Sequence, residues 1–360
     1  RPLMPGQEVS NRPVLVSFVL LPWRTLLPLP FRQTEPLPRF SYVGQSWPDF
    51  SVFLQDKNAW AISVAIGSVL NALLILAVGT WLVCRKNVSE AAVCAFILLA
   101  LSSPYILIQT FFTWPKALAG YFVMLSYLSV KRGLSPGIVG LSLGLAYWSH
   151  PFAVVYAAAF AAWLTWRGFI SHGMRAIVNR QVIIYCFSLI IVVAPWFIWM
   201  KLVLHIPSDL VTQNLLLPGQ SGIDFLWIRL SNLFNTFLPV YFQQYPFDAN
   251  GVLRSSSVNM AGAIGLFPMA FLLHRFISHG DLFKSDVLLP WIVPCVLLVA
   301  VFSGPAIPAV HGLQPVVMFG LAVAVVHFFS FAQARLVWSI LIIQIALNAL
   351  LFGRYLRGLL

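Results

Sequence analysis

Charged residues are scarce in this chain. Only 9% of its 360 residues are Asp, Glu, Lys or Arg, whereas 60% are hydrophobic. A soluble domain normally carries about 25% charged residues, so this composition does not cover the surface of a water-soluble globule. We therefore expect an integral membrane protein built from helices, which satisfy their own backbone hydrogen bonds in lipid.

Several signatures of metal and nucleotide chemistry are also missing. The sequence contains neither a Walker-type phosphate loop nor a His-Glu-x-x-His pair, so nucleotide-driven transport and zinc proteolysis lack support. Its 4 cysteines fall in or beside apolar stretches without Cys-x-x-Cys spacing, which is typical of buried thiols. The residues present do not support a divalent metal, and we assign no cofactor.

Long apolar stretches predict the fold class: an all-α, polytopic transmembrane bundle with about nine or ten spans, two of them short half-helices, and interfacial helices on the outer face. The predicted spans are Ala59 to Cys84, Ala91 to Phe112, Ala117 to Val130, the two halves of Pro136 to Trp166, Val182 to Leu204, Val258 to Leu273, Val287 to Phe302, Pro308 to Phe331 and Leu336 to Phe352.

The stretch Pro136 to Trp166 is the most informative part of the chain. It is nearly uncharged and is broken at its midpoint by Ser149-His150-Pro151. Each half covers only ~20 Å, less than the ~30 Å hydrocarbon core, so we expect two short helices that meet at a polar vertex. A basic loop adjoins each end of the stretch. This pattern predicts a helical hairpin that enters and leaves the membrane from one side and presents His150 at its tip.

The distribution of charge predicts the orientation. The basic loops fall on one side if the spans alternate, and the positive-inside rule assigns that side to the cytoplasm. The segments that these loops include are Arg85-Lys86, Lys131-Arg132, Arg167 to Arg180, Arg275 with Lys284, and Arg335. The net charge of +12 is largely explained by these loops and by contact with membrane lipids, so we expect no nucleic-acid partner.

We expect four parts along the chain, and the acidic residues gather in the outer ones. These are 1–58, an outer loop with an interfacial helix at Val14 to Leu21; 59–204, the first part of the transmembrane core; 205–257, an outer loop; and 258–360, the second part of the core. Phe225 to Val240 is amphipathic and is expected to lie along the outer surface. Because the chain opens with Arg1 rather than Met, we expect an N-terminally truncated fragment.

Four short patterns together resemble the GT-C class of membrane glycosyltransferases, which includes protein O-mannosyltransferases and aminoarabinose transferases. They are Asn11-Arg12-Pro13-Val14-Leu15, Trp148-Ser149-His150-Pro151, Ala194-Pro195-Trp196-Phe197-Ile198-Trp199 and His311-Gly312-Leu313-Gln314-Pro315. The resemblance covers most of the chain, through loose and apolar motifs. It implies an enzyme that moves a sugar from a polyprenyl-phosphate carrier to a lipid, glycan or protein acceptor on the outer face of a plasma (inner) membrane.

The chain departs from that class at two acidic positions. Members usually carry an Asp or an Asp-Glu pair early in the first outer loop, and none stands near the start here. Many members also have an Asp before the span where this chain has Thr113-Trp114-Pro115-Lys116, so an ammonium replaces a carboxylate. These departures weaken the case for metal-assisted chemistry and leave open a non-catalytic relative of the fold.

Candidate substrate-binding residues lie at the predicted outer edges. Lys116 suits the anionic oxygens of a polyprenyl phosphate, and His150 suits the same phosphate or the role of general acid. The alternatives are a snorkelling lysine and a histidine that only satisfies backbone carbonyls freed at a helix break. Further candidates for substrate binding are His311, Gln314, Arg254 and Arg229, with a structural or headgroup-anchoring role as the alternative for each.

Three carboxylates are the candidate catalytic bases: Asp209, Asp224 and Asp248. The alternative for each is a loop or capping role. Two functions therefore remain in view, a glycosyltransferase and a non-catalytic transporter or lipid-binding scaffold whose broken helices form a substrate path. Polar groups gather at one edge rather than at mid-membrane, which favours the enzyme. Gly137, Gly140 and Gly144 form a small-residue face that predicts close helix packing without a ligand.

Overall fold

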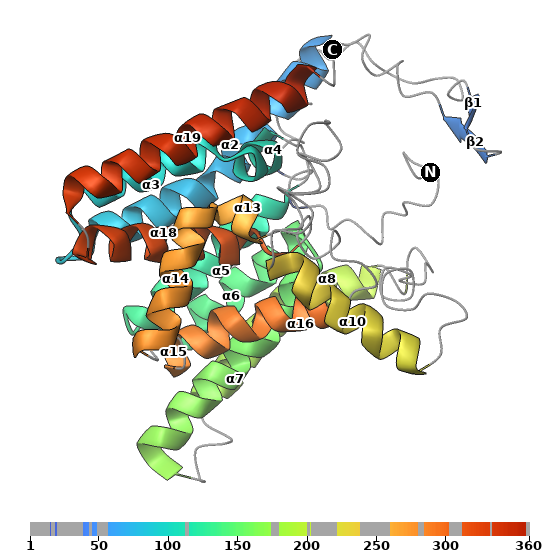
Figure 1. Ribbon diagram of the computed structural model, residues 1–360. Helices are drawn as coiled ribbons and strands as arrows, with labels where there is room; N and C mark the ends of the chain where they lie inside the picture. The colour runs from blue at the N-terminus through green and yellow to red at the C-terminus, as the bar shows by residue number, and fades with distance from the viewer. Residues whose placement is uncertain are drawn as a thin grey trace.

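A computed structural model describes residues 15, 19, 39–42, 45–48, 57–111, 115–173, 180–199, 202, 222–237, 260–279, 284–301, 312–331 and 333–357. This part of the chain is a bundle of helices, with α5 and α6 near its middle and α7 projecting from it at one end (Figure 1). The strands described are two short ones, β1 (Arg39–Tyr42) and β2 (Gln45–Pro48), which pair antiparallel. The predicted helical bundle is confirmed at this level.

The helices follow the predicted apolar stretches closely. They are α2 (Lys57–Val83), α3 (Glu90–Ser102), α4 (Pro104–Phe111), α5 (Lys116–Lys131), α6 (Pro136–Ser149), α7 (Ala153–His172), α8 (Arg180–Ile198), α10 (Gly222–Phe237), α13 (Met260–Ile264), α14 (Leu266–His279), α15 (Ser285–Val287), the π-helix η6 (Leu288–Ile292), α16 (Val293–Val301), α18 (Gln314–Phe331) and α19 (Ala334–Arg357).

Fewer helices than expected meet the requirements for a membrane span. Among the described residues, 4 helices are long and apolar enough: α2, α7, α8 and α19. The number rises to 5 if α3 and α4, bent by 68° at Ser103, count as one broken span. The bend is explained by Pro104, because the residue before a proline is pushed out of the helical conformation. The larger number of nine or ten stays a prediction.

The broken hairpin is present, but its halves differ in length. α6 ends at Ser149 and α7 begins at Ala153, so the polar vertex lies between them as expected. α6 has 14 residues, whereas α7 has 20 and is long enough to span a membrane by itself. The expectation of two short half-helices is therefore wrong for α7, because Arg167 does not end it: the helix continues for more than a turn beyond that charge.

The glycine face of α6 is confirmed as a close contact with α8. A Cβ atom on Gly140 would come within 2.3 Å of the Tyr185 carbonyl oxygen, and one on Gly144 within 2.6 Å of Val192. The stretch Gly140-Leu141-Ser142-Leu143-Gly144 also matches the Gly-x-Ser-x-Gly pattern of serine hydrolases in letters. Because it lies inside a helix rather than at a strand-to-helix turn, it is not a nucleophile elbow.

Aromatic side chains fill the middle of the bundle and join five elements. Trp291 of η6 stacks on Phe319 of α18 with ring centroids 4.3 Å apart, and Tyr127 of α5 lies 5.8 Å from Trp163 of α7. Trp81 of α2 lies 5.2 Å from Phe319. Such rings bury large apolar areas, so this cluster fixes how α5, α7 and α18 approach one another.

Helix α10 has the reverse of the usual amphipathic arrangement. Its apolar residues Ile223 and Trp227 are 83% and 71% exposed, while Arg229, Asn232 and Thr236 are buried where the helix packs on α16 and α13. The guanidinium of Arg229 lies over the Phe225 ring at 4.3 Å, and burial lowers its pKa. Exposed apolar and buried polar faces suit a helix whose outer face contacts lipid, and the predicted position along the outer surface stays a prediction.

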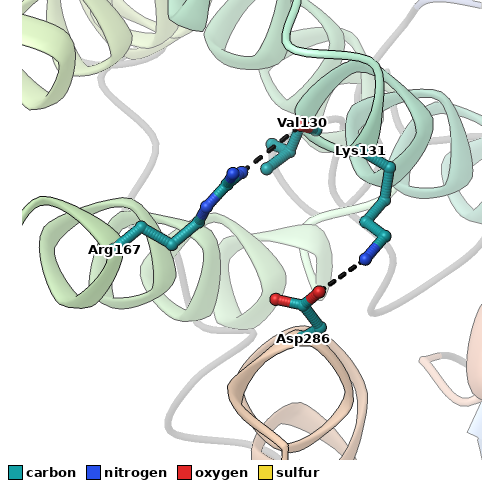
Figure 2. A network of polar contacts seen from close by, with 4 residues as sticks. All are labelled: Val130, Lys131, Arg167 and Asp286. Carbon is teal, nitrogen blue, oxygen red and sulfur yellow. Dashed lines mark hydrogen bonds and ion pairs between the residues drawn. The ribbon is translucent and has the colours of Figure 1, made fainter. Parts of the chain in front are cut away.

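Three charged residues join α5, α7 and α15 at one end of the bundle (Figure 2). Lys131 Nζ lies 2.5 Å from Asp286 Oδ2, and Arg167 donates to the carbonyl oxygen of Val130 at 3.3 Å. Cations are favourable at a helix C-terminus, where carbonyl groups lack intrahelical partners. Because Val130 precedes α6 and Arg167 lies late in α7, the two ends of the hairpin lie close together, and their side of a membrane stays a prediction.

The Lys131–Asp286 pair predicts a small, acid-sensitive contribution to stability. Burial raises the pKa of Asp286, but the hydrogen bond and charge of Lys131, with Trp163 and Arg167, outweigh it, so the pKa is lower than usual. A lowered carboxyl pKa stabilises the fold above about pH 4, and this is lost as the pH falls through the folded-state value. Because both side chains are over 40% exposed, we expect Asp286→Asn to cost at most about 1 kcal/mol at pH 7.

Unfolding of both proteins in detergent, followed from pH 7 to about pH 3, measures this contribution. The difference between wild type and variant is expected to vanish at the acid end. A difference that persists or grows there would show that Asp286 acts through packing rather than charge.

Candidate functional site

The N-terminal ends of α5, α7 and α18 meet around one small hollow, which we call the first hollow. Its cavity volume is about 10 Å³. The residues that line it are Lys116, Ala119, Gly120, Val123, His150, Phe152, Ala153, Tyr156, Gly312, Gln314 and Pro315. None of them is acidic. Each helix N-terminus carries a partial positive charge from its backbone dipoles, so this arrangement favours an anion.

Lys116 is the first residue of α5 and is only 2% exposed. A cation at this position opposes the helix dipole, in contrast to Lys131 at the other end of the same helix. The start of α5 is held from α2: Asn71 accepts a hydrogen bond from the Leu118 N–H at 3.2 Å and donates to the Thr110 carbonyl at 3.3 Å. The ammonium is thus presented by a helix end whose position is fixed by its neighbours.

His150 lies at the helix break, 9% exposed, with its ring stacked on that of Phe152 at 5.0 Å between centroids. Its Nδ1 accepts a long hydrogen bond of 3.4 Å from the Phe152 N–H. A neutral imidazole with an accepting Nδ1 carries its proton on Nε2, so this contact assigns the Nε2–H tautomer. His150 is therefore a hydrogen-bond donor, which suits the oxygens of an anion.

Tyr156 and Gln314 complete the first hollow. The Tyr156 hydroxyl donates to the Gly312 carbonyl at 2.5 Å, which ties α7 to the chain just before α18. A Cβ on Gly312 would lie 2.9 Å from a methyl group of Leu298, so a larger residue there would require the leucine side chain to move. Gln314, the first residue of α18, is 2% exposed and donates from Nε2 to Gln109 Oε1 at 3.2 Å.

A second hollow includes both glutamines and shares Gln314 with the first. Its cavity volume is also about 10 Å³. The other residues that line it are Asn71, Leu74, Ile75, Tyr105, Ile106, Gln109, Thr110, Ala117 and Met318. At this volume each hollow has room for a water-sized group and is far smaller than the ~300–1,000 Å³ of typical small-molecule pockets.

The structure therefore brings together three of the residues that we selected from the sequence: Lys116, His150 and Gln314. Two others are described but line neither hollow. Asp224 is exposed in the first turn of α10, where a carboxylate favours the helix dipole, and Arg229 is buried on the same helix. Asp209, Asp248, Arg254, His311 and the interfacial helix predicted at Val14 to Leu21 lie outside the described residues, apart from positions 15 and 19, which are helical.

Gln109, Asn71 and Tyr156 were not predicted from the sequence, although each is polar and buried. A single glutamine, asparagine or tyrosine in an apolar span was the only available signal, since buried polar groups in membranes often mark function. In the part of the chain that the structure describes, no cluster of three or more His, Cys, Asp or Glu side chains gathers around a common point. Comparison of the chain with protein-family models, curated proteins and solved structures found no match.

Proposed function

We propose that this protein is a membrane glycosyltransferase that moves a sugar from a polyprenyl-phosphate donor to an acceptor on the extracytoplasmic face. The observation that supports this most strongly is the first hollow, where an ammonium, an imidazole N–H and three helix N-termini converge. Together they create a positive potential inside an apolar bundle. A lipid phosphate has both the charge for that hollow and the hydrocarbon chain for the membrane around it.

The proposed step is a transfer with inversion. The acceptor hydroxyl oxygen forms a bond to the anomeric carbon, and the bond from that carbon to the phosphate oxygen breaks with its electron pair on the phosphate. Lys116 stabilises the charge that develops on the leaving phosphate, and the His150 Nε2–H donates to it. The hydroxyl proton passes to a base, for which Asp209, Asp224 and Asp248 remain the candidates.

The proposed location is a multi-pass plasma (inner) membrane protein with its active face outside. Lys116 and Lys131 are at opposite ends of α5, about 22 Å apart along a helix of 16 residues. Lys131, Arg167 and Asp286 form the end that carries basic loops, which the positive-inside rule assigns to the cytoplasm. The first hollow then belongs to the opposite half of the bundle.

Transfer from a radiolabelled polyprenyl-phosphate sugar tests the proposal. We expect Lys116→Ala and His150→Ala each to lower transfer about 10²-fold, because each removes one donor to the leaving phosphate. Lys86→Ala is the matched control, since Lys86 is an exposed lysine in a loop, and it is expected to transfer like wild type. Unchanged transfer in both hollow variants would remove the assigned site.

A lipid-binding scaffold or transporter is the second candidate function. It is favoured by one observation: no acidic residue lines either described hollow, so the described site lacks a base. A scaffold would bind polyprenyl phosphate with the same dependence on Lys116, but it would release the sugar-linked lipid unchanged in the transfer assay. Binding without transfer would therefore select this function over the enzyme.

A further inference from the structure

The last turns of α2, α5 and α7 lie at one end of the bundle, away from the first hollow. Near the start of α5, its Leu118 bonds to Asn71 of α2. Further along, the ring of Tyr127 in α5 lies 6.4 Å from Trp81 of α2 and 5.8 Å from Trp163 of α7. α7 itself begins at the first hollow. The three helices therefore run in the same direction, and their C-terminal parts gather opposite the hollow.

Five exposed cations mark this end of the bundle, which we call the basic end. Two of them are guanidinium groups held over aromatic rings. Arg85 lies over Trp81 at 5.1 Å, and Arg167 lies over Trp163 at 5.9 Å. Such cation–π contacts hold a charge in place before any ligand binds. The five residues are Arg85, Lys86, Lys131, Arg132 and Arg167.

The negative groups at the basic end do not balance these cations. Among the described residues two carboxylates lie here: Asp286 of α15, which pairs with Lys131, and Glu90, which begins α3 after the loop from α2. Each helix C-terminus adds roughly half a negative charge, so three helix ends and two carboxylates supply about 3.5 negative charges. The five cations exceed that total, so the basic end keeps a positive potential.

An anionic headgroup can reach these cations without entering a cavity. The Lys131–Asp286 pair is open to the surroundings, with side chains 42% and 41% exposed, and Arg167 acts on the same carboxylate (Figure 2). Arg85 lies nearby, since the Tyr127 side chain interacts electrostatically with both Arg85 and Asp286. Three cations from three helices thus surround one carboxylate, which leaves two of their charges for an anion from outside the protein.

We propose that the basic end binds the phosphodiester headgroup of an anionic phospholipid through Arg85, Lys131 and Arg167. Guanidinium groups bind phosphate with paired, charge-assisted hydrogen bonds. Basic clusters beside membrane helices bind the anionic lipids of the cytoplasmic leaflet, and the positive-inside rule assigns the basic end to that leaflet. Lys116 lies at the opposite end of α5, so this site is separate from the proposed donor site and does not rest on it.

Thermal unfolding of the full chain in an uncharged detergent, measured at increasing concentrations of added lipid, tests the proposal. The probes are dioleoyl-phosphatidylglycerol, dioleoyl-phosphatidylcholine and inorganic phosphate. We expect phosphatidylglycerol to bind about 25-fold more tightly than phosphatidylcholine, because each of the two unbalanced cations contributes about fivefold. The difference is expected to shrink as the salt concentration rises, and inorganic phosphate is expected to leave the unfolding temperature unchanged.

Three variants test the assigned contacts. Arg85→Gln and Arg167→Gln each remove one charge, and glutamine at position 167 keeps an N–H donor for the Val130 carbonyl. Each is expected to weaken binding of phosphatidylglycerol about fivefold and to leave binding of phosphatidylcholine unchanged. Asp286→Asn is expected to strengthen binding of phosphatidylglycerol about fivefold, because it removes the carboxylate that competes for Lys131. A gain in affinity cannot result from a loss of folding.

Lys116→Met is the control at the other end of α5. It is expected to bind phosphatidylglycerol like wild type while it loses affinity for polyprenyl phosphate. If it loses phosphatidylglycerol as well, the lipid occupies the first hollow and this inference is wrong. The inference is also wrong if phosphatidylcholine or inorganic phosphate acts as strongly as phosphatidylglycerol, or if both arginine variants bind like wild type. Failure of the wild type to bind polyprenyl phosphate would contradict the proposed function alone.

Discussion

Replacing Lys116 by methionine is expected to weaken binding of polyprenyl phosphate by about two to three orders of magnitude. The ammonium is 2% exposed, so its interaction with a phosphate is poorly screened by water. Removing one partner of a buried ion pair costs about 3–5 kcal/mol, and each 1.4 kcal/mol is a factor of ten in affinity. Methionine keeps the apolar stem of lysine, so the change is confined to the charge. Titration of the lipid into nanodiscs that hold the protein measures it.

Lys86→Met tests whether any lysine would have the same effect. Lys86 is exposed in the loop after α2, so its charge is screened and its replacement is expected to change affinity less than about twofold. The thermal unfolding profile of each variant without lipid shows whether the bundle is intact. Equal affinities for the two variants would refute a phosphate site at Lys116.

A single methyl group at Gly140 is expected to destabilise the bundle strongly. The Cβ atom of Gly140→Ala would lie 2.3 Å from the Tyr185 carbonyl oxygen and 3.0 Å from the Leu189 nitrogen, both of them backbone atoms. Because backbone cannot rotate away as a side chain can, α6 and α8 must separate, at a cost of up to about 3 kcal/mol. The movement would also strain the bond of 2.7 Å from the Tyr185 hydroxyl to the Ala157 carbonyl.

Gly79→Ala provides the matched comparison on another helix. Gly79 lies inside α2, and a Cβ there meets nothing within 4 Å, so alanine is expected to stabilise the protein by up to about 1 kcal/mol through helix propensity. Unfolding of both variants in detergent measures the two effects, which should have opposite signs. If Gly140→Ala unfolded like wild type, the close approach of α6 and α8 would be wrong.

Most helices could be predicted because apolar stretches in this chain are long and their ends are marked. The break at His150 was visible from Pro151, and the contact of α6 with α8 from the spacing of its glycines. The full length of α7 could not be predicted, because Arg167 was interpreted as the end of a span. In the structure Arg167 of α7 donates a hydrogen bond to the Val130 carbonyl near the end of α5. Its charge therefore has a partner inside the bundle, and α7 continues past it.

The candidate site could be predicted only in part. Lys116 and His150 were recognisable because ionisable groups are rare in this sequence, and each comes first in or just before a helix. The hydrogen bond between Gln109 and Gln314 could not be recognised, since the two glutamines are 205 positions apart and neither belongs to a spaced motif. Their contact follows from where the rest of the bundle places α4 and α18, which local patterns do not encode.

The inverted polarity of α10 bears on how the protein is made. Arg229, Asn232 and Thr236 are buried on a helix that contacts α16 and α13, and both of these helices come later in the chain. These contacts do not exist while the ribosome is still translating the segment between α10 and α16. Packing of α10 into the bundle must therefore follow synthesis of the chain up to Val301, where α16 ends.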